Sequence, residues 1–385
     1  MKIPSIKNVV KKLWILLFTQ NPYKVKTFCE VTGSRIGEQI DLAEHRNFKY
    51  KAGSGELIYY SPNNKRKNNH IPDRSIGGEK RYLNTGLFRS PDRYVYSLSG
   101  GSIFSQIGLI YHKEKRTFID ESAKEWLLNL KESPYTHIIN FPAKKKLSGI
   151  TVSCLTNGSD GGFYHFIFES IIKIKLYEPI LKYTNWILLN GPATEWKLKW
   201  IRRARIAESK IIWMTNTDHF DCEQLIFTNR LISDQQINHW CVNTLNEIFS
   251  ISQTLPSGAD PKIIWISRRG LERDIKWEKE ILHHFPEFEI VDLSSMDVET
   301  TIQKLQQATH IIGPHGAGLS NVYLCKPKTK ILEIYPLGKT YQPCYSRISE
   351  VCSLQYYCDV LNFEDKNHQD YGLGYAKRLL NEFIS

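Results

Sequence analysis

One stretch, residues 305–336, constrains the fold more than any other part of the sequence. It holds two short apolar runs, 310–312 and 330–335, which are rich in β-branched residues and too short for helices. Between them lie a glycine-rich loop, GPHGAGLSN, and a segment of helical character. Parallel strands need such a crossover, so the stretch predicts one βαβ unit.

The loop of this unit carries Gly313, Gly316 and Gly318 around His315. Glycines let backbone amides approach a phosphate closely, and the N-terminus of the following helix presents unpaired N–H groups. Many glycine loops are plain turns, so the loop alone leaves both a phosphate site and a turn open.

The rest of the chain from residue 150 onward alternates strand and helix patterns, which is typical of an α/β protein. The segment 253–261, QTLPSGADP, combines two prolines and a glycine with little apolar content, and it is the best linker in the chain. A chain of 385 residues can hold two domains of ordinary size. The sequence therefore predicts two successive α/β domains.

Three motifs together resemble glycosyltransferase family 61. The first is the run His315-Gly316-Ala317-Gly318-Leu319, followed by Asn321 and by the strand that holds Glu333 and Pro336. The second is the arginine-rich segment 267–281, SRRGLERDIKWEKEI, and the third is the aromatic-histidine segment 161–171, GGFYHFIFESI. The motifs cover about half of the chain, and residues 1–148 receive no support from them.

The resemblance implies a GT-B fold, an α/β arrangement of two Rossmann-like domains that face each other across a cleft. We expect an N-terminal, acceptor-side domain at 1–252, with a poorly assigned N-terminal extension, and a linker at 253–261. A nucleotide-sugar-binding domain is expected at 262–345, and a tail at 346–385 whose helix packs back across the domains. Ligands of open parallel sheets bind beyond the carboxyl ends of the strands, where the Arg268 loop and the glycine loop both begin.

Transfer from a nucleotide diphosphate sugar requires a site that stabilises the departing pyrophosphate. Arginines and aimed backbone amides suit this task. His315 is expected to bond the diphosphate or a sugar hydroxyl, or alternatively loop carbonyls. By resemblance Glu333 accepts ribose hydroxyls, and a salt bridge to an arginine is its alternative. The expected donor-binding residues are Arg268, Arg273, Gly313, His315, Gly316, Ala317, Gly318, Leu319, Asn321 and Glu333.

The base that activates the acceptor must come from the facing domain. His165 has an unperturbed pKa suited to proton transfer near neutrality, and Glu169 lies one helical turn further on. These are the expected catalytic residues, although both could instead bond partners in the domain interface. Asp160 is a third candidate for the base, with helix N-capping as its more ordinary role. Glu278 matches an acidic residue of the family, whereas Trp277 replaces a position that is commonly Asn there.

No cofactor and no metal ion are expected. The sequence contains no Asp-x-Asp triplet, which disfavours the usual metal-dependent alternative, and its eight cysteines form no C-x-x-C pair. The expected function is an inverting glycosyltransferase of polysaccharide or capsule synthesis, with a nucleotide sugar and a glycan acceptor as partners. The donor sugar, the linkage and the oligomeric state stay open.

Two other functions fit the sequence less well. A nicotinamide dehydrogenase would carry G-x-G-x-x-G, whereas the order here is G-x-x-G-x-G. A non-catalytic nucleic-acid binder would explain the net charge of +11 and the basic, aromatic segment 196–205, but inward-packed tryptophans explain that segment equally well.

No stretch approaches the roughly 18–20 apolar residues of a membrane-spanning helix. Residues 6–18 predict a basic amphipathic helix that packs on the protein or lies on an anionic membrane. A cytoplasmic protein is favoured, and a peripheral contact with the inner face of the membrane stays open.

Overall fold

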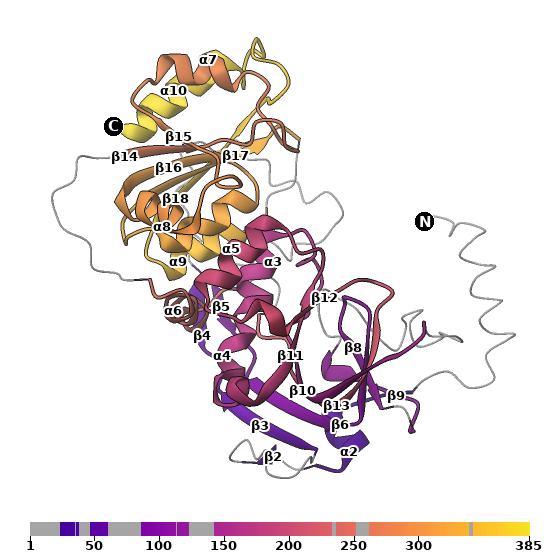
Figure 1. The fold of residues 1–385 in the computed structure, drawn as a ribbon. Helices are drawn as coiled ribbons and strands as arrows, with labels where there is room; N and C mark the ends of the chain where they lie inside the picture. The colour runs from indigo at the N-terminus through magenta and orange to yellow at the C-terminus, as the bar shows by residue number, and fades with distance from the viewer. Residues whose placement is uncertain are drawn as a thin grey trace, which may run out of the picture.

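The computed structural model describes residues 24–34, 36–37, 47–60, 86–112, 114–122, 142–232, 236–251, 262–338 and 342–385. The described chain is a mixed α/β protein with parallel strands in both of its large sheets. In Figure 1 the C-terminal sheet lies above the N-terminal sheet, with helices α3, α5 and α9 between them. The predicted helix 6–18, most of the predicted helix 122–133 and the predicted linker 253–261 lie outside the described residues.

The C-terminal sheet has five parallel strands in the described part of the chain. Their order is β15 (Glu289–Val291), β14 (Lys262–Ile266), β16 (Ala308–Pro314), β17 (Lys330–Pro336) and β18 (Gln355–Leu361). The glycine loop and the 3₁₀ helix η8 (Ala317–Leu324) connect β16 to β17, which confirms the predicted βαβ unit.

The order of these strands creates a topological switch point. From β14 the chain passes through α7 (Glu278–His284) to β15 on one side, and α8 (Val298–Gln307) then carries it back to β16 on the other side. Asp297 caps α8 by accepting a hydrogen bond from the Thr300 amide at 2.8 Å. Beyond the carboxyl ends of β14 and β16 such sheets form their ligand crevice.

The C-terminal tail differs from its prediction. Residues 355–361 form the edge strand β18 of the sheet, and α10 (Leu373–Ile384) packs on α7 of the same sheet. The helix α9 (Cys344–Val351) makes the crossing contact instead: its Arg347 guanidinium lies 5.1 Å from the ring of Tyr60. Because β18 completes the sheet, residues 346–385 are part of the C-terminal unit rather than an appendage to it.

The N-terminal sheet combines a parallel and an antiparallel region. The parallel region contains β13 (His219–Thr228), β10 (Lys145–Ser153), β11 (Thr184–Asn190) and β12 (Ile211–Met214) in that order. Strands from the N-terminal extension continue the sheet, and β7, β8 and β9 form an antiparallel meander within it. They are β1 (Lys24–Lys26), β2 (Ile36–Gly37), β3 (Phe48–Gly53), β6 (Arg93–Ser99), β7 (Gly101–Phe104), β8 (Leu109–His112) and β9 (Thr117–Ile119). A separate hairpin pairs β4 (Leu57–Tyr60) with β5 (Gly86–Arg89).

The helix that follows β10 is interrupted by a π-helical segment. It runs as α3 (Phe163–His165), the π segment η5 (Phe166–Ile171) and α4 (Lys173–Tyr177). Single π turns inside α-helices are frequent at functional sites. The other helices of this half are α2 (Phe28–Thr32), α5 (Glu195–Arg203) and α6 (His239–Ile248).

An apolar contact joins the two halves. The rings of Phe168 in η5 and Tyr323 in η8 meet edge to face with centroids 5.4 Å apart. One cluster of buried hydrophobic side chains extends from Ile58 through both sheets to Val360. Burial of this apolar surface is the main force that holds the halves together.

Candidate functional site

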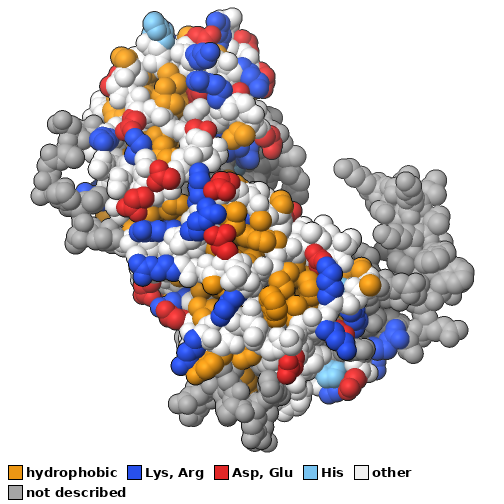
Figure 2. Space-filling model, in the orientation of Figure 1, with side chains coloured by type: hydrophobic (Ala, Val, Ile, Leu, Met, Phe, Trp, Pro, Cys, Tyr) orange, Lys and Arg blue, Asp and Glu red, His pale blue; other side chains and the backbone are white. Residues whose placement is uncertain are grey.

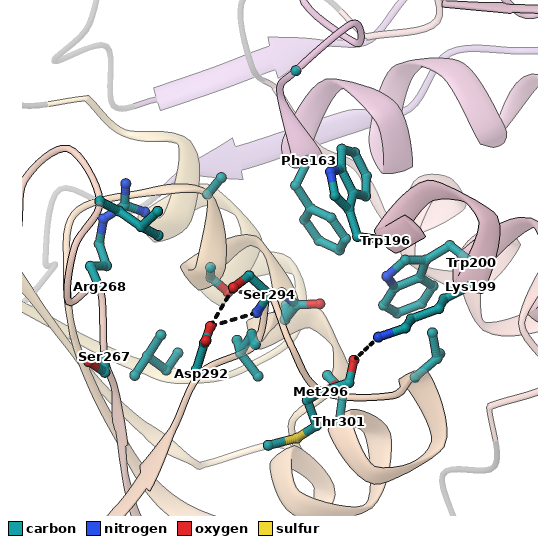
Figure 3. Close-up of a pocket in the computed structure, with 18 residues that line it drawn as sticks. Phe163, Trp196, Lys199, Trp200, Ser267, Arg268, Asp292, Ser294, Met296 and Thr301 are labelled. Carbon is teal, nitrogen blue, oxygen red and sulfur yellow. Dashed lines mark hydrogen bonds between the residues drawn. The ribbon is translucent and has the colours of Figure 1, made fainter. Parts of the chain in front are cut away.

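A cavity of about 330 Å³ lies at the switch point, between the strand ends of the C-terminal sheet and the helices α3 and α5 (Figure 3). One wall comes from the loops after β14 and β15, a second from η8, and a third from the N-terminal half. It is lined by Gly161, Phe163, Trp196, Lys199, Trp200, Ile266, Ser267, Arg268, Leu271, Asp292, Leu293, Ser294, Met296, Val298, Thr301, Ala317, Gly318 and Asn321.

A buried carboxylate organises the loop after β14. Glu278 accepts hydrogen bonds from Trp265 Nε1 at 2.7 Å, from Ser267 Oγ at 2.8 Å and from Arg269 Nη2 at 3.0 Å. These bonds join the strand, the loop and the start of α7. Glu278 therefore shapes the loop that carries Arg268, and Trp277 packs in the core beside it.

The Arg268 side chain lies directly against the glycine loop. A Cβ atom on Gly316 would stand 2.1 Å from Arg268 Nη1, so any other residue there would displace the guanidinium from its present position. Arg268 donates to the Glu272 carbonyl from Nε at 3.2 Å and from Nη2 at 2.9 Å. The predicted meeting of Arg268 with the glycine loop is therefore found in the structure.

The positive charges of Arg268 and Arg273 are not neutralised by acidic side chains of the described residues. Burial lowers the pKa of Arg268, and the nearby charge of Arg273 lowers it further. Within the described ranges, neither arginine has a carboxylate oxygen within ion-pair distance, and Arg273 Nε is buried without a hydrogen-bond partner. Two cations without acidic partners form a place where an anion is stabilised.

The glycines beside Arg268 allow the loop to pack closely on β14. A Cβ on Gly313 would lie 3.1 Å from the Cβ of Ile266, and one on Gly318 would lie 3.2 Å from Cγ2 of the same side chain. Both glycines thus hold η8 close to the strand. The N-terminus of η8 consequently opens at the cavity, next to Arg268.

His315 is held from several sides. Its Nδ1 bonds the carboxylate of Glu333, its ring stacks on Tyr335 with centroids 4.7 Å apart, and Tyr345 lies at 5.4 Å. Glu333 is fully buried and also accepts a hydrogen bond from Tyr356. The expectation that Glu333 bonds ribose hydroxyls or an arginine is therefore corrected, because its two oxygens already bond His315 and Tyr356.

The predicted donor-binding residues are only partly gathered at the cavity. Arg268, Ala317, Gly318 and Asn321 line it. The remaining ones form the support of this wall or lie beside it: Gly313, His315, Gly316, Leu319, Glu333 and Arg273. The buried position of Leu319 follows from its packing in the core beneath η8.

The N-terminal wall was not foreseen as part of a ligand site. Phe163 from α3 and two tryptophans from α5, Trp196 and Trp200, present aromatic rings to the cavity. Lys199 donates across it to the carbonyls of Ser295 at 3.1 Å and Met296 at 3.4 Å. Helix α5 thus closes the cavity from the N-terminal side.

The basic character of α5 does not create a nucleic-acid surface. Arg202 pairs with Glu195 and Glu208, and Arg203 pairs with Glu299, at distances of 2.8 to 3.2 Å. Lys197 is buried and donates to backbone carbonyls, and burial lowers its pKa to about 8. On the face shown in Figure 2, Lys and Arg side chains are interspersed with Asp and Glu.

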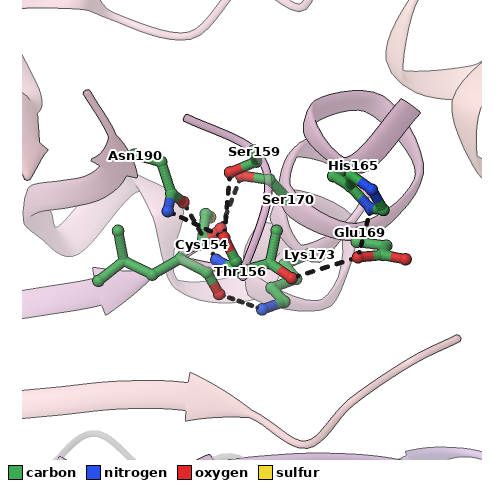
Figure 4. Close-up of polar contacts among 9 residues, drawn as sticks. Cys154, Thr156, Ser159, His165, Glu169, Ser170, Lys173 and Asn190 are labelled. Atoms are coloured by element: carbon green, nitrogen blue, oxygen red, sulfur yellow. Dashed lines mark hydrogen bonds and ion pairs between the residues drawn. The ribbon is translucent and has the colours of Figure 1, made fainter. Parts of the chain in front are cut away.

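A second cluster of hydrogen-bonded polar side chains lies near the end of β10, behind the residues that line the cavity (Figure 4). His165 Nδ1 bonds Glu169 Oε2 at 3.1 Å, and Thr156 Oγ1 bonds the same oxygen at 3.4 Å. Lys173 donates to the Leu155 carbonyl at 2.5 Å. The predicted pairing of His165 with Glu169 is therefore found, although neither residue lines the cavity itself.

Asp160 does not cap the helix, contrary to the ordinary role considered for it. The N-cap position of α3 is Gly162, which makes no side-chain capping bond, and Asp160 accepts a hydrogen bond from Gln106 Nε2 at 3.3 Å. Within the described ranges, no group of three or more His, Cys, Asp or Glu side chains has the arrangement of a metal site. None of the described helices is long and apolar enough to cross a membrane.

Comparison with known proteins gives a family match and similar solved structures. Residues 163–332 match the protein-family model described as Glycosyltransferase 61, a segment that includes the His165 helix, the arginine loop and the glycine loop. No curated protein matches the chain. One similar solved structure is described as the bacterial iron-containing dodecameric glycosyltransferase TibC from enterotoxigenic E. coli H10407. The likeness covers 63% of this chain and 77% of that one at 8% identity, and its TM-score of 0.27 is too low to bear on fold or function.

Proposed function

Residues 163–332 of this glycosyltransferase belong to glycosyltransferase family 61, and we propose that the enzyme transfers a sugar from a nucleotide diphosphate sugar to a hydroxyl of a glycan or polysaccharide acceptor. The reaction proceeds with inversion and without a metal ion. The observation that carries the proposal is the seat of Arg268 on Gly316, at the mouth of a cavity at the switch point of the C-terminal sheet.

In this proposal the pyrophosphate of the donor lies at Arg268 and the N-terminus of η8. When the bond between the sugar C1 and the pyrophosphate oxygen breaks, both electrons remain on that oxygen, and negative charge grows there. The guanidinium, the neighbouring charge of Arg273 and the amides that follow Gly316 stabilise it. The arginines thus stabilise the leaving pyrophosphate, as a divalent cation does in metal-dependent transferases.

His315 completes the anion site from behind the loop. Its Nδ1 is engaged by Glu333, so Nε2 is the nitrogen that reaches toward a ligand. The bond to the carboxylate fixes the orientation of the ring, so that Nε2 bonds a phosphate or sugar oxygen of the donor. Glu333 thereby acts through His315 rather than on the substrate.

The acceptor approaches from the N-terminal half. Its hydroxyl oxygen attacks C1 on the face opposite the pyrophosphate, and its proton goes to His165, whose imidazolium Glu169 stabilises. The α3 helix packs against η8, which supports a role for His165 close to the donor. The rings of Phe163, Trp196 and Trp200 offer a flat apolar wall on which a sugar ring stacks.

The wider organisation follows the same proposal. The chain is a GT-B enzyme with its acceptor side at 1–252, its linker at 253–261 and its donor side from 262 onward. We place it in the cytoplasm, in polysaccharide or capsule synthesis, with a peripheral membrane contact through residues 6–18, which lie outside the described residues.

The test is a donor screen on the purified full-length chain. UDP, GDP, ADP and dTDP sugars are added in the presence of EDTA, thermal stability is measured, and the linkage and anomeric configuration of any product are read by NMR. We expect one nucleotide class to stabilise the protein and to give a product of inverted configuration. Absence of binding by every donor would refute the proposal, and binding without transfer to any acceptor would favour a non-catalytic nucleotide-binding protein.

Two arginine variants give this test a matched pair. Arg268→Ala is expected to weaken binding of the nucleoside diphosphate by about 10- to 100-fold, since hydrogen bonds to a charged group contribute about 1.5–3 kcal/mol. Arg202→Ala removes an arginine from the outer face of α5, where it pairs with two glutamates, and is expected to leave binding unchanged.

A further inference from the structure

One buried lysine has no part in the steps above. Lys197 lies in the first turn of α5, and its side chain is completely buried. Lysine side chains are almost never fully buried unless they are paired, because an ammonium loses its hydration there. Burial lowers the pKa of Lys197 to about 8, so the group is still mostly charged at neutral pH. Its surroundings should therefore show what the charge is used for.

The ammonium of Lys197 donates to three backbone carbonyls from two loops. Its Nζ lies 2.7 Å from the carbonyl oxygen of Asp160, 2.9 Å from that of Asn190 and 3.2 Å from that of Pro192. Asp160 belongs to the loop after β10, and the other two lie at the end of β11 and in the turn that follows it. All three N–H donors of the ammonium are thus used. Lys197 ties the carboxyl ends of two adjacent parallel strands to α5.

The loop after β10, residues 156–162, is also held at its other end. The Asn190 side chain donates from Nδ2 to the Thr156 carbonyl at 2.9 Å, and its Oδ1 accepts from the Thr156 amide at 3.1 Å (Figure 4). Lys197 bonds the loop at Asp160, near the beginning of α3. Asn190 and Lys197 therefore fix the two ends of this loop.

The ring of His165 rests on the backbone between these two ends. A Cβ atom on Gly158 would stand 2.8 Å from His165 Cδ2, and one on Gly162 would stand 2.9 Å from the same atom. The Gly162 amide donates to the Gly158 carbonyl at 2.9 Å, which closes the turn under the ring. A movement of this loop would consequently move the imidazole.

We propose that Lys197 is a positioning residue for sugar transfer: its ammonium holds residues 156–162 against the ring of His165, so that the imidazole keeps the orientation in which it accepts the proton of the acceptor hydroxyl. The inference rests on the proposed function, in which His165 is the base. A misplacement of a reacting group by about 1 Å can lower the rate about 10²-fold, even when the substituted residue is far from the chemistry.

The charge of this ammonium can be removed by a change of pH. Asp160 is the charged group that acts on Lys197, and its carboxylate partly offsets the effect of burial on the pKa. The other elements packed against the ammonium present aromatic rings: Nζ lies 5.6 Å from the ring centroid of Trp196 and 5.7 Å from those of Phe166 and Trp213. A neutral amine has only two N–H donors for the three carbonyls, and its lone pair repels the third.

The pH dependence of kcat in the unsubstituted full-length protein tests the inference first. We expect kcat to fall about tenfold between about pH 7 and pH 9, because loss of the proton from Lys197 loosens the loop under His165. The donor is the nucleotide sugar that gives product in the screen described above. A kcat that stays constant over this range would overturn the inference.

Lys197→Met then identifies the residue responsible. Methionine keeps an unbranched side chain of similar length but removes the three donors, so kcat at neutral pH is expected to fall about 10²-fold. The alkaline fall should disappear, and calorimetric binding of UDP or GDP should stay unchanged, since Lys197 does not line the cavity. Lys175→Met makes the same change in α4, where the lysine pairs with Glu178 and Glu247, and is expected to keep both kcat and the alkaline fall.

The outcomes separate this inference from the function on which it rests. If the unsubstituted protein transfers no sugar, the proposed function fails and the inference fails with it. If it transfers sugar and the folded Lys197→Met variant keeps the kcat and the alkaline fall, only the inference on Lys197 is overturned. If circular dichroism shows that this variant does not fold, the pH dependence of the unsubstituted protein decides.

Discussion

Each half of the molecule contains a histidine–glutamate pair, and the two pairs are built in different ways. His165 and Glu169 lie one turn apart in a single helix, whose π segment begins at the next residue. His315 and Glu333 come from different strands: His315 follows β16, and Glu333 lies within β17. The first pair needs only a helix, whereas the second exists only when the sheet has formed.

The surroundings of the pairs differ as well. The side chain of His165 is 16% exposed and that of Glu169 is 9% exposed, whereas Glu333 is completely buried and its histidine is sandwiched near two tyrosines. A partly exposed pair can exchange a proton with a substrate. A buried and stacked pair fixes a ring in place, so the comparison teaches that the same two residue types leave a ring partly accessible in one half and hold it rigid in the other.

The largest expected effect is on kcat, and it concerns the partly exposed pair of His165 and Glu169. His165→Ala is expected to lower kcat by about 10²- to 10⁴-fold, because a positioned general base contributes that much to rate. Affinity for the nucleoside diphosphate should stay unchanged, since His165 does not line the cavity. Steady-state kinetics and calorimetry measure the two quantities. A variant with normal kcat would remove His165 from catalysis.

The next effect concerns the buried pair. Glu333→Gln is expected to lower the free energy of unfolding by about 2–3 kcal/mol, because glutamine has one acceptor oxygen and leaves either His315 or Tyr356 buried without its hydrogen-bond partner. Urea denaturation followed by circular dichroism measures the change. Glu178→Gln removes an exposed glutamate paired with Lys175 and serves as the control. Equal stability of the two variants would contradict the rigid role of Glu333.

Glu169→Gln sharpens the contrast between the two glutamates. It is expected to reduce kcat by about 10-fold, because a neutral partner stabilises the imidazolium of His165 less well than a carboxylate does. Its unfolding midpoint should shift much less than that of the Glu333 variant. If both glutamine variants lost stability equally and kept their kcat, the two pairs would serve the same structural purpose.

The smallest effect concerns the tyrosine behind the buried pair. Tyr356→Phe deletes the hydroxyl that donates to Glu333 and is expected to cost about 1 kcal/mol of unfolding free energy, the net worth of one hydrogen bond. The neighbouring Tyr357→Phe, whose ring packs on Phe383, is the control. Thermal and urea denaturation should give the same ranking of the two variants.

Patterns of local origin could be predicted from the sequence. The βαβ unit, the glycine loop and the pairing of His165 with Glu169 all depend on residues that are close in the chain. The meeting of Arg268 with Gly316 was also anticipated, since both loops follow parallel strands at the same edge.

Features that depend on the order of strands in the sheet could not be predicted from the sequence. The place of Asp292 at the cavity depends on the pairing of β15 with β14, which no local pattern of residues specifies. Glu333 was expected to bond ribose hydroxyls or an arginine, whereas the pairing of β18 with β17 brings Tyr356 to its buried carboxylate. The apolar run QYYCDVL of β18 was the signal that the tail contributes a strand.

Trp196 and Trp200 show a different limit. Their segment carries both aromatic and basic residues, so its composition fits a nucleic-acid surface and a packed helix equally. The structure resolves this through the ion pairs of Arg202 and Arg203, which leave the tryptophans facing Phe163 and the cavity.

The hydrophobic cluster shared by the two sheets has a consequence for how substrates reach the cavity. Wide separation of the halves would expose its side chains to water at a cost of about 25 cal/mol for each Å² of apolar surface. The two halves are therefore expected to stay in contact while substrates enter and leave, and the exposed side chain of Leu271 marks the part of the cavity's lining that faces water.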